Sequence, residues 1–182
     1  DQDPERAKVS RKMFFNEAHM VGMLQHPNIM PIYDAGEEDG SYYVVTEHIQ
    51  GARTLAAYCR PDNLLRVDDV VEIIYKCAKA LHYAHEQEML HRDIKPSNVM
   101  FREDGSAVLT DFGGAKILNS AANITVSGTV AGTPAYMAPE QWTTDRPDRR
   151  SDIYSLGIVL YQVVTGQLPF KDETPGRLMF KH

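Results

Sequence analysis

The chain has 182 residues, of which 43% are hydrophobic and 24% are charged. This length and composition allow one sizeable domain or two small lobes around a cleft. The formal net charge of -6 argues against a nucleic-acid partner held by a basic surface, and the longest apolar run, near residues 158–164, is too short to span a bilayer.

The first predicted elements are a helix and a hairpin. Phe14, Ala18, Val21 and Leu24 recur at helical spacing, which predicts an amphipathic helix over residues 10–24. Residues 29–35 and 42–46 are predicted strands. Residues 36–40 between them have glycine at both ends and an Asp-Gly pair, so we expect a loop that joins two antiparallel strands.

A long helix is predicted next, because Asp69 and Glu72 have the spacing of a capping box. Its expected core face is Val70, Ile74, Cys77, Leu81 and Ala84. Residues 99–101 and 107–110 are predicted short strands, and residues 151–165 are a predicted helix that is apolar almost all round and therefore buried. Cys59 and Cys77 lack metal-ligand spacing and are expected to be reduced, buried thiols.

Three motifs follow one another in the second half of the chain. Residues 91–98 read His-Arg-Asp-Ile-Lys-Pro-Ser-Asn, residues 111–113 read Asp-Phe-Gly, and residues 138–140 read Ala-Pro-Glu. In this order they resemble the signature set of protein kinases, and the chain is similar to the bacterial serine/threonine kinases of the eukaryotic-like family. The resemblance implies an α+β, two-lobed kinase fold.

The resemblance also implies roles for the motif residues in phosphoryl transfer. Asp93 would accept the proton of the substrate hydroxyl, Lys95 would reach the transferring phosphate, and Asn98 and Asp111 would hold Mg²⁺. Taken alone, Asp93 could be a solvated loop residue and Lys95 a surface lysine. Asn98 could merely satisfy loop backbone and Asp111 could cap a turn.

The nucleotide site is implied in the same way. Glu17 would be the helix glutamate that pairs with a phosphate-contacting lysine, although by itself it is a solvated helix residue. Thr46 would be the gatekeeper, and the backbone of Glu47, His48 and Ile49 would form the hinge that binds adenine. Met100 belongs to the same implied ATP site.

Two further assignments follow from the resemblance. Asp152 would be the buried aspartate that braces the catalytic loop, or else a simple partner of the helix dipole. A column of four side chains, Val21, Ile32, His91 and Phe112, would resemble the regulatory spine of the family. Gly114 stands where the family usually has a larger apolar residue.

The sequence departs from the family at both ends. Nothing before Glu17 resembles G-x-G-x-x-G or the strand lysine, and the chain stops where the family continues with further helices. We therefore expect a fold truncated at both ends, with a partial upper lobe over residues 1–50 and a partial lower lobe over residues 51–182. The polypeptide by itself is expected to have little or no activity.

The predicted function is transfer of the γ-phosphoryl group of ATP, with Mg²⁺, to serine or threonine hydroxyls of proteins in the cytoplasm. The alternatives are a non-catalytic, kinase-like scaffold, suggested by the missing glycine loop, and a small-molecule kinase. Lys95 and the segment 132–140 favour protein substrates. Arg92 is expected to bind a phosphate on the activation segment, where the candidate acceptors are Thr125, Ser127 and Thr129.

Overall fold

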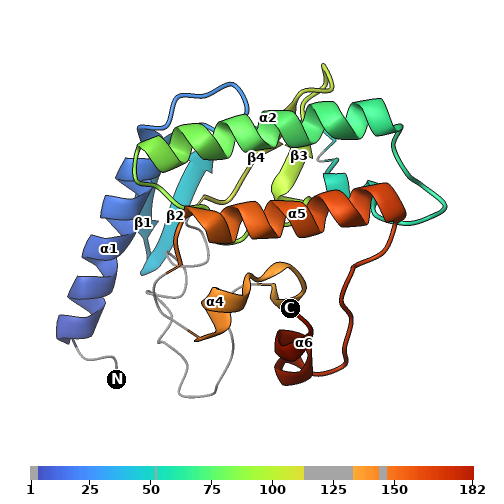
Figure 1. The fold of residues 1–182 in the computed structure, drawn as a ribbon. Helices are drawn as coiled ribbons and strands as arrows, with labels where there is room; N and C mark the ends of the chain where they lie inside the picture. The colour runs from blue at the N-terminus through green and yellow to red at the C-terminus, as the bar shows by residue number, and fades with distance from the viewer. Residues whose placement is uncertain (1–3, 52, 113–132, 144–146) are drawn as a thin grey trace.

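Two long helices and two small antiparallel sheets form the body of the computed structural model (Figure 1). It describes residues 4–51, 53–112, 133–143 and 147–182, without the side chains of residues 4–8, 10, 13, 17 and 143. The α+β class and the kinase-like order of elements are confirmed. Among the helices in these ranges, none combines the length and apolarity needed to cross a bilayer.

The first helix, α1, spans Pro4–Gly22 and packs against the first sheet. The predicted inner face is confirmed, because Phe14, Ala18, Val21 and Leu24 are all buried. The bounds differ from the prediction: the helix starts six residues before residue 10 and ends before Leu24. Residues 4–9 extend the helix through their helical propensity, and they contain no apolar pattern from which the extension could be predicted.

The first sheet pairs β1 (Ile32–Glu38) with β2 (Ser41–Thr46). The prediction that residues 36–40 form the loop was wrong, since the strand continues to Glu38. Asp39 and Gly40 alone make the turn, with φ of 50° and 76°. Positive φ at both central residues is the geometry that lets a two-residue turn follow the twist of the strands, so no longer loop is needed.

The long helix α2 spans Val67–Glu86. Its predicted core face is confirmed except that Ile73 is buried and Ile74 only partly so. The predicted capping box is wrong, because the N-cap is Arg66 and makes no side-chain cap hydrogen bond. Asp69 lies inside the first turn, where its charge favours the positive end of the helix dipole.

The second sheet pairs β3 (Val99–Phe101) with β4 (Ala107–Leu109). Short 3-10 turns precede it at Leu55–Tyr58 and Pro96–Asn98. Ile29, which the prediction placed in the first strand, instead forms a parallel bridge with Leu109. This bridge joins the loop after α1 to the second sheet.

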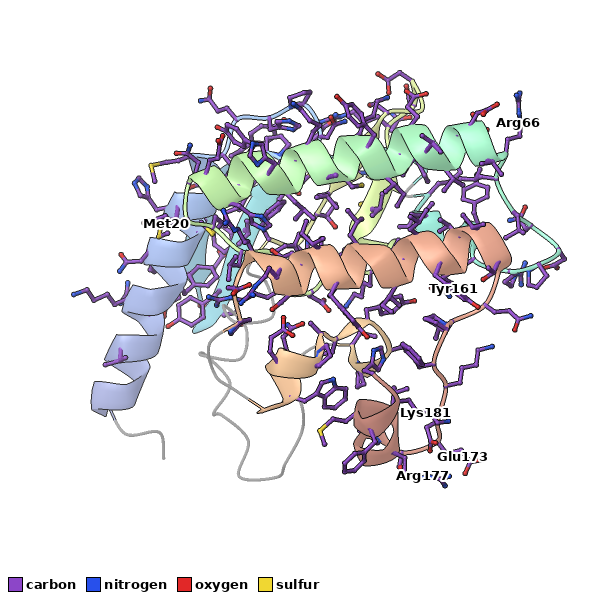
Figure 2. All side chains as sticks on the ribbon, viewed as in Figure 1. Met20, Arg66, Tyr161, Glu173, Arg177 and Lys181 are labelled. Carbon is purple, nitrogen blue, oxygen red and sulfur yellow. The ribbon has the colours of Figure 1, made fainter. Side chains whose placement is uncertain are left out.

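The C-terminal part begins with a 3-10 turn at Pro134–Tyr136, followed by α4 (Pro139–Thr143), α5 (Arg149–Thr165) and α6 (Pro175–Lys181). Helix α5 lies alongside α2 (Figure 1). Its expected stop at Gly166 is confirmed by a left-handed φ of 72°. The prediction that α5 is buried all round was wrong, because Ile153, Leu160, Tyr161 and Val164 are 38–51% exposed. Figure 2 shows Tyr161 on this helix.

Candidate active site

A cavity of about 620 Å³ lies where the first sheet, the segment after it and the second sheet meet. Its lining includes six of the seven residues that the resemblance assigned to nucleotide binding, namely Thr46, Glu47, His48, Ile49, Met100 and Asp111. The seventh, Glu17, lies on α1, but its side chain is outside the described structure. The fold thus brings sequence positions 46–49, 100 and 111 to one cavity, whose volume is typical of a small-molecule site.

Aromatic and aliphatic side chains close the inner end of this cavity. Phe112 packs on His91 with 4.5 Å between ring centroids, and Val21 and Phe112 belong to one buried cluster against which Ile32 packs. The four members of the expected spine therefore lie together. Phe14 and Tyr42 also line the cavity, 4.7 Å apart between ring centroids, and the sequence analysis assigned neither of them to nucleotide binding.

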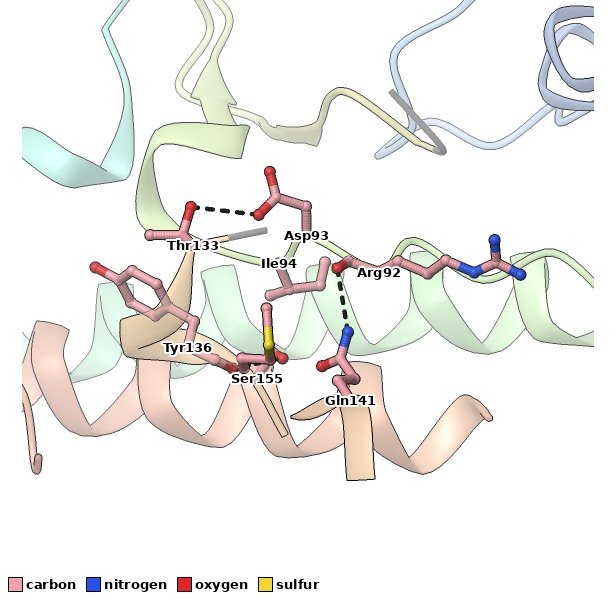
Figure 3. A pocket seen from close by; sticks show the side chains of 8 residues that line it. Arg92, Asp93, Ile94, Thr133, Tyr136, Gln141 and Ser155 are labelled. Atoms are coloured by element: carbon pink, nitrogen blue, oxygen red, sulfur yellow. Dashed lines mark hydrogen bonds between the residues drawn. The ribbon is translucent and has the colours of Figure 1, made fainter. Parts of the chain in front are cut away.

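The catalytic loop gathers three polar side chains around Asp93. Lys95 Nζ donates to Asp93 Oδ2 at 2.5 Å and to Thr133 Oγ1 at 3.1 Å, and Thr133 Oγ1 lies 3.4 Å from Asp93 Oδ1. Figure 3 shows Thr133 and Asp93 facing each other. Asp93 is only 13% exposed and Lys95 only 24%, so neither is the freely solvated surface residue that the alternative readings required.

Asn98 is positioned by the same loop. Its Nδ2 donates to the Asp93 carbonyl at 2.9 Å, which orients the amide, while its Oδ1 has only a long contact of 3.5 Å from Ser97 Oγ. The backbone N–H of Thr110 donates to the Asn98 carbonyl at 2.9 Å and so brings Asp111, the next residue, toward the loop.

The oxygens of Asn98 and Asp111 fit a divalent cation. Within the described ranges, no donor binds the carboxylate of Asp111, and Asn98 presents a weakly used amide oxygen. Hard oxygen ligands are what Mg²⁺ requires, and it commonly keeps waters and nucleotide phosphates as its other ligands. No group of three or more His, Cys, Asp or Glu side chains that could hold a metal occurs in the described part of the chain.

Asp152, in the first turn of α5, braces the catalytic loop from beneath. It is 1% exposed, and its carboxylate accepts hydrogen bonds from the backbone N–H of His91 at 2.9 Å and of Arg92 at 2.8 Å, and contacts His85 Nε2 at 2.8 Å. Burial opposes the ionised form, but the hydrogen bonds from His85 and the loop outweigh it and lower the pKa of Asp152. The bracing role is confirmed.

The brace holds a backbone conformation that would otherwise be unfavourable. Arg92 has φ of 68° and Asp111 has φ of 61°, both in the left-handed region that costs an ordinary L-residue about 1 to 2 kcal/mol. Because Asp152 binds the N–H of Arg92, this conformation is fixed and Asp93 is presented at one orientation.

His91 is buried and neutral. Its Nε2 lies 2.8 Å from the Thr110 carbonyl, so Nε2 carries the proton, and Nδ1 accepts from the backbone N–H of Asp93 at 3.3 Å. Burial lowers the pKa of His91, although Asp152 opposes this change. The neutral imidazole therefore links the two motifs that contain Asp93 and Asp111.

The segment before α4 is attached to the catalytic loop and to α5. Gln141 Nε2 donates to the Arg92 carbonyl at 3.4 Å, and its Oε1 accepts from the N–H of Ala138 at 2.9 Å (Figure 3). Ser155 Oγ donates to the Tyr136 carbonyl at 2.7 Å. Among the described residues, Arg92 Nε is buried without a hydrogen-bond partner. Gly114, Thr125, Ser127 and Thr129 lie outside the described residues.

Two further residues that support this site were missed by the sequence analysis. His85 looked like one more residue of a long helix, and no spacing links it to Asp152, which lies 67 positions away. Arg102 looked like part of a surface turn, yet it forms a bidentate ion pair with Glu47. Only the folded chain brings these partners together.

An aspartate, a lysine and an asparagine on one braced loop, with Ser97 of that loop and Asp111 in the cavity lining, form the arrangement expected of a protein kinase fold. The family model described as "Protein kinase domain" matches residues 2–181, and the chain belongs to this family. Members of the family use ATP and a divalent metal ion.

The chain is similar to several curated bacterial proteins. It is 39% identical to serine/threonine-protein kinase PrkC of Bacillus subtilis over 171 residues, which are 94% of this chain and 26% of the relative. It is 36% identical to serine/threonine-protein kinase PknB of Mycobacterium leprae, with 93% of this chain and 28% of the relative covered. The chain therefore spans about a quarter of the length of these relatives.

Proposed function

We propose that this chain is part of the catalytic domain of a protein serine/threonine kinase, which transfers the γ-phosphoryl group of ATP to hydroxyls of proteins. The observation that supports this most is the cluster of Asp93, Lys95 and Thr133, because the loop that carries Asp93 and Lys95 also contributes Ser97 to the lining of the 620 Å³ cavity. A binding-only module has no physical need for a carboxylate and an ammonium group held together next to a nucleotide-sized space.

Each residue has a distinct task in this proposal. Asp93 orients the attacking hydroxyl and accepts its proton, and Lys95 places positive charge where the phosphoryl group passes. Thr46, Glu47, His48, Ile49 and Met100 form the adenine site, and Glu17 would pair with a phosphate-contacting lysine. Asn98 and Asp111 would hold Mg²⁺, which supplies charge neutralisation at the phosphates when it is bound with ATP.

Protein substrates are favoured over small molecules by the link between Lys95 and Thr133. Thr133 opens the segment that runs through Tyr136 to α4, and the segment is anchored to α5 and to the catalytic loop. A peptide docked on this segment would therefore have its hydroxyl next to Asp93. The same proposal divides the chain into an upper lobe over residues 1–50 and a lower lobe over 51–182. It also places the protein in the cytoplasm, where ATP is plentiful and Cys59 and Cys77 stay reduced.

Control by phosphorylation is also proposed. Arg92 Nε is buried and has no partner within the described ranges, and a phosphate on Thr125, Ser127 or Thr129 would supply charge-assisted hydrogen bonds to it. Mass spectrometry before and after phosphatase treatment, with activity measured in parallel, tests this. An Arg92→Ala variant as active as the parent would remove the switch.

The test of the main proposal uses the full-length protein, ATP, Mg²⁺ and a protein substrate. Asp93→Asn is expected to lower kcat by roughly 10² to 10⁴ while ATP affinity stays nearly intact, as for loss of a positioned proton acceptor. Asp111→Asn is expected to weaken Mg²⁺-dependent ATP binding. A parent protein that binds ATP without transferring phosphate would favour the scaffold alternative, and a product rich in phosphotyrosine would refute the serine/threonine assignment.

A further inference from the structure

Arg102, the residue directly after β3, connects three separate segments. Its Nε donates to Glu47 Oε1 at 2.8 Å and its Nη2 to Glu47 Oε2 at 2.7 Å, which is a bidentate ion pair. Its Nη1 donates to the carbonyl of Pro27 at 2.8 Å. The segments are thus the β3–β4 turn, the hinge after β2 and the loop between α1 and β1.

Two of these three segments are already fixed to each other. Asn28 Nδ2 donates to the Ala107 carbonyl at 2.7 Å, the N–H of Leu109 donates to the Asn28 carbonyl at 2.9 Å, and the N–H of Met30 donates to the Leu109 carbonyl at 2.8 Å. Arg102 itself is held by its backbone N–H, which donates to the Ser106 carbonyl at 3.0 Å. The loop after α1 and the second sheet therefore form one rigid base.

The hinge is the segment that lacks such attachment. In the described part of the chain, no backbone–backbone hydrogen bond outside the strands holds residues 47–49. Their backbone groups are therefore available to bind a nucleotide, and the position of the hinge depends on side-chain contacts. Glu47 is in the cavity lining, and its carboxylate attaches the start of the hinge to the base, while Ile49 at the end of the hinge packs with Met30 and Val108.

The geometry of this ion pair differs from that of the exposed pair formed by Arg66 and Asp68. Arg102 and Glu47 have side chains 26% and 25% exposed, whereas Arg66 and Asp68 make a single contact of 3.4 Å and are 80% and 87% exposed. The hydrogen bond from Arg102 lowers the pKa of Glu47, and the same contact raises the pKa of Arg102. Bidentate, partly buried pairs of this kind hold a fixed orientation, while exposed single contacts contribute little.

We infer that Arg102 is a positioning residue for nucleotide binding, which keeps the hinge at a fixed place over the cavity by tying Glu47 to the base formed by the loop after α1 and the second sheet. This inference rests on the proposed function, because the cavity must be the ATP site. Arg102 does not touch the reacting atoms, so its loss should affect binding of ATP and leave the chemical step almost unchanged.

The test compares Glu47→Gln, Arg102→Gln and the double variant in the full-length protein, with Arg66→Gln as a matched control on an exposed ion pair. Each single variant is expected to raise KM for ATP roughly threefold to tenfold with kcat within about twofold of the parent. The double variant should be no worse than the worse single variant, because both remove one interaction. Arg102→Lys keeps the positive charge but loses the bidentate geometry of the guanidinium, so its KM for ATP should lie between those of the parent and Arg102→Gln.

Hydrogen exchange of the paired backbone amides at the end of β2, which leads directly into the hinge, gives a readout that needs no activity. Without nucleotide, exchange should be roughly threefold to tenfold faster in the two single variants than in the parent and the Arg66→Gln control. If Arg102→Gln does not fold, KM for ATP and hydrogen exchange of Glu47→Gln alone test whether the ion pair positions the hinge. Unchanged KM and unchanged exchange, or effects that multiply in the double variant, would overturn the inference. A parent that neither binds nor uses ATP would instead overturn the proposed function, while the exchange measurement would still decide the role of Arg102.

Discussion

Replacing Asp152 with asparagine tests the brace under the catalytic loop. The carboxylate accepts from two backbone N–H groups, of His91 and Arg92, and contacts His85 at 2.8 Å. Asparagine offers one acceptor oxygen, so one buried backbone donor must face an amide NH₂ group. A hydrogen bond to a charged group contributes about 1.5 to 3 kcal/mol, and an unsatisfied buried donor costs about 1 to 3 kcal/mol.

We therefore expect Asp152→Asn to lower the free energy of unfolding by about 2 to 4 kcal/mol, a large part of the usual total of about 5 to 15 kcal/mol. The left-handed conformation of Arg92 would no longer be fixed, so Asp93 would lose its orientation. In the full-length protein, kcat should fall roughly 10- to 100-fold with a much smaller change in KM for ATP.

Equilibrium unfolding in urea and steady-state kinetics measure the two effects. Asp148→Asn is the matched control, because Asp148 is the N-cap of the same helix and accepts from the N–H of Arg150, a role that asparagine fills equally well. If Asp152→Asn changed stability and kcat no more than Asp148→Asn did, the bracing argument would be refuted.

Two further predictions concern pH and backbone conformation. Because burial lowers the folded-state pKa of His91, its contribution to stability is present at neutral pH and is lost as pH falls below about 6.5, where the unfolded chain binds the proton. His91→Phe should be about 1 to 3 kcal/mol less stable than the parent at pH 7.5, and urea titrations should show this gap narrowing toward pH 5; a constant gap would contradict it. Gly166→Ala should destabilise by about 2 to 4 kcal/mol, because φ is 72° and a Cβ would lie 2.4 Å from the backbone nitrogen of Pro61. Gly157→Ala, on the exposed side of α5 with no atom within 4 Å, should instead stabilise by up to about 1 kcal/mol, so thermal unfolding that shifts both variants the same way would disprove the distinction.

Much of the local structure could be predicted from periodicity. The inner faces of α1 and α2 were right because burial imposes a repeat of 3.6 residues on the sequence. Boundaries were less predictable: α1 begins at Pro4 and β1 runs on to Glu38, since strand pairing and helix propensity act without a hydrophobic pattern. The expectation for α5 failed because composition does not say which side of an apolar helix a neighbour covers.

The sequence by itself determined the kinase family and the identity of the polar residues, because Asp93, Lys95, Asn98 and Asp111 lie in short motifs whose chemistry depends on residue type and local spacing. Tertiary structure alone decided which distant groups support them. His85 and Asp152 are 67 positions apart, and Glu47 and Arg102 are 55 apart, yet both pairs are in direct contact. Hydrogen bonds and ion pairs act only over a few ångströms of space, and nothing in the order of residues along a chain records that distance.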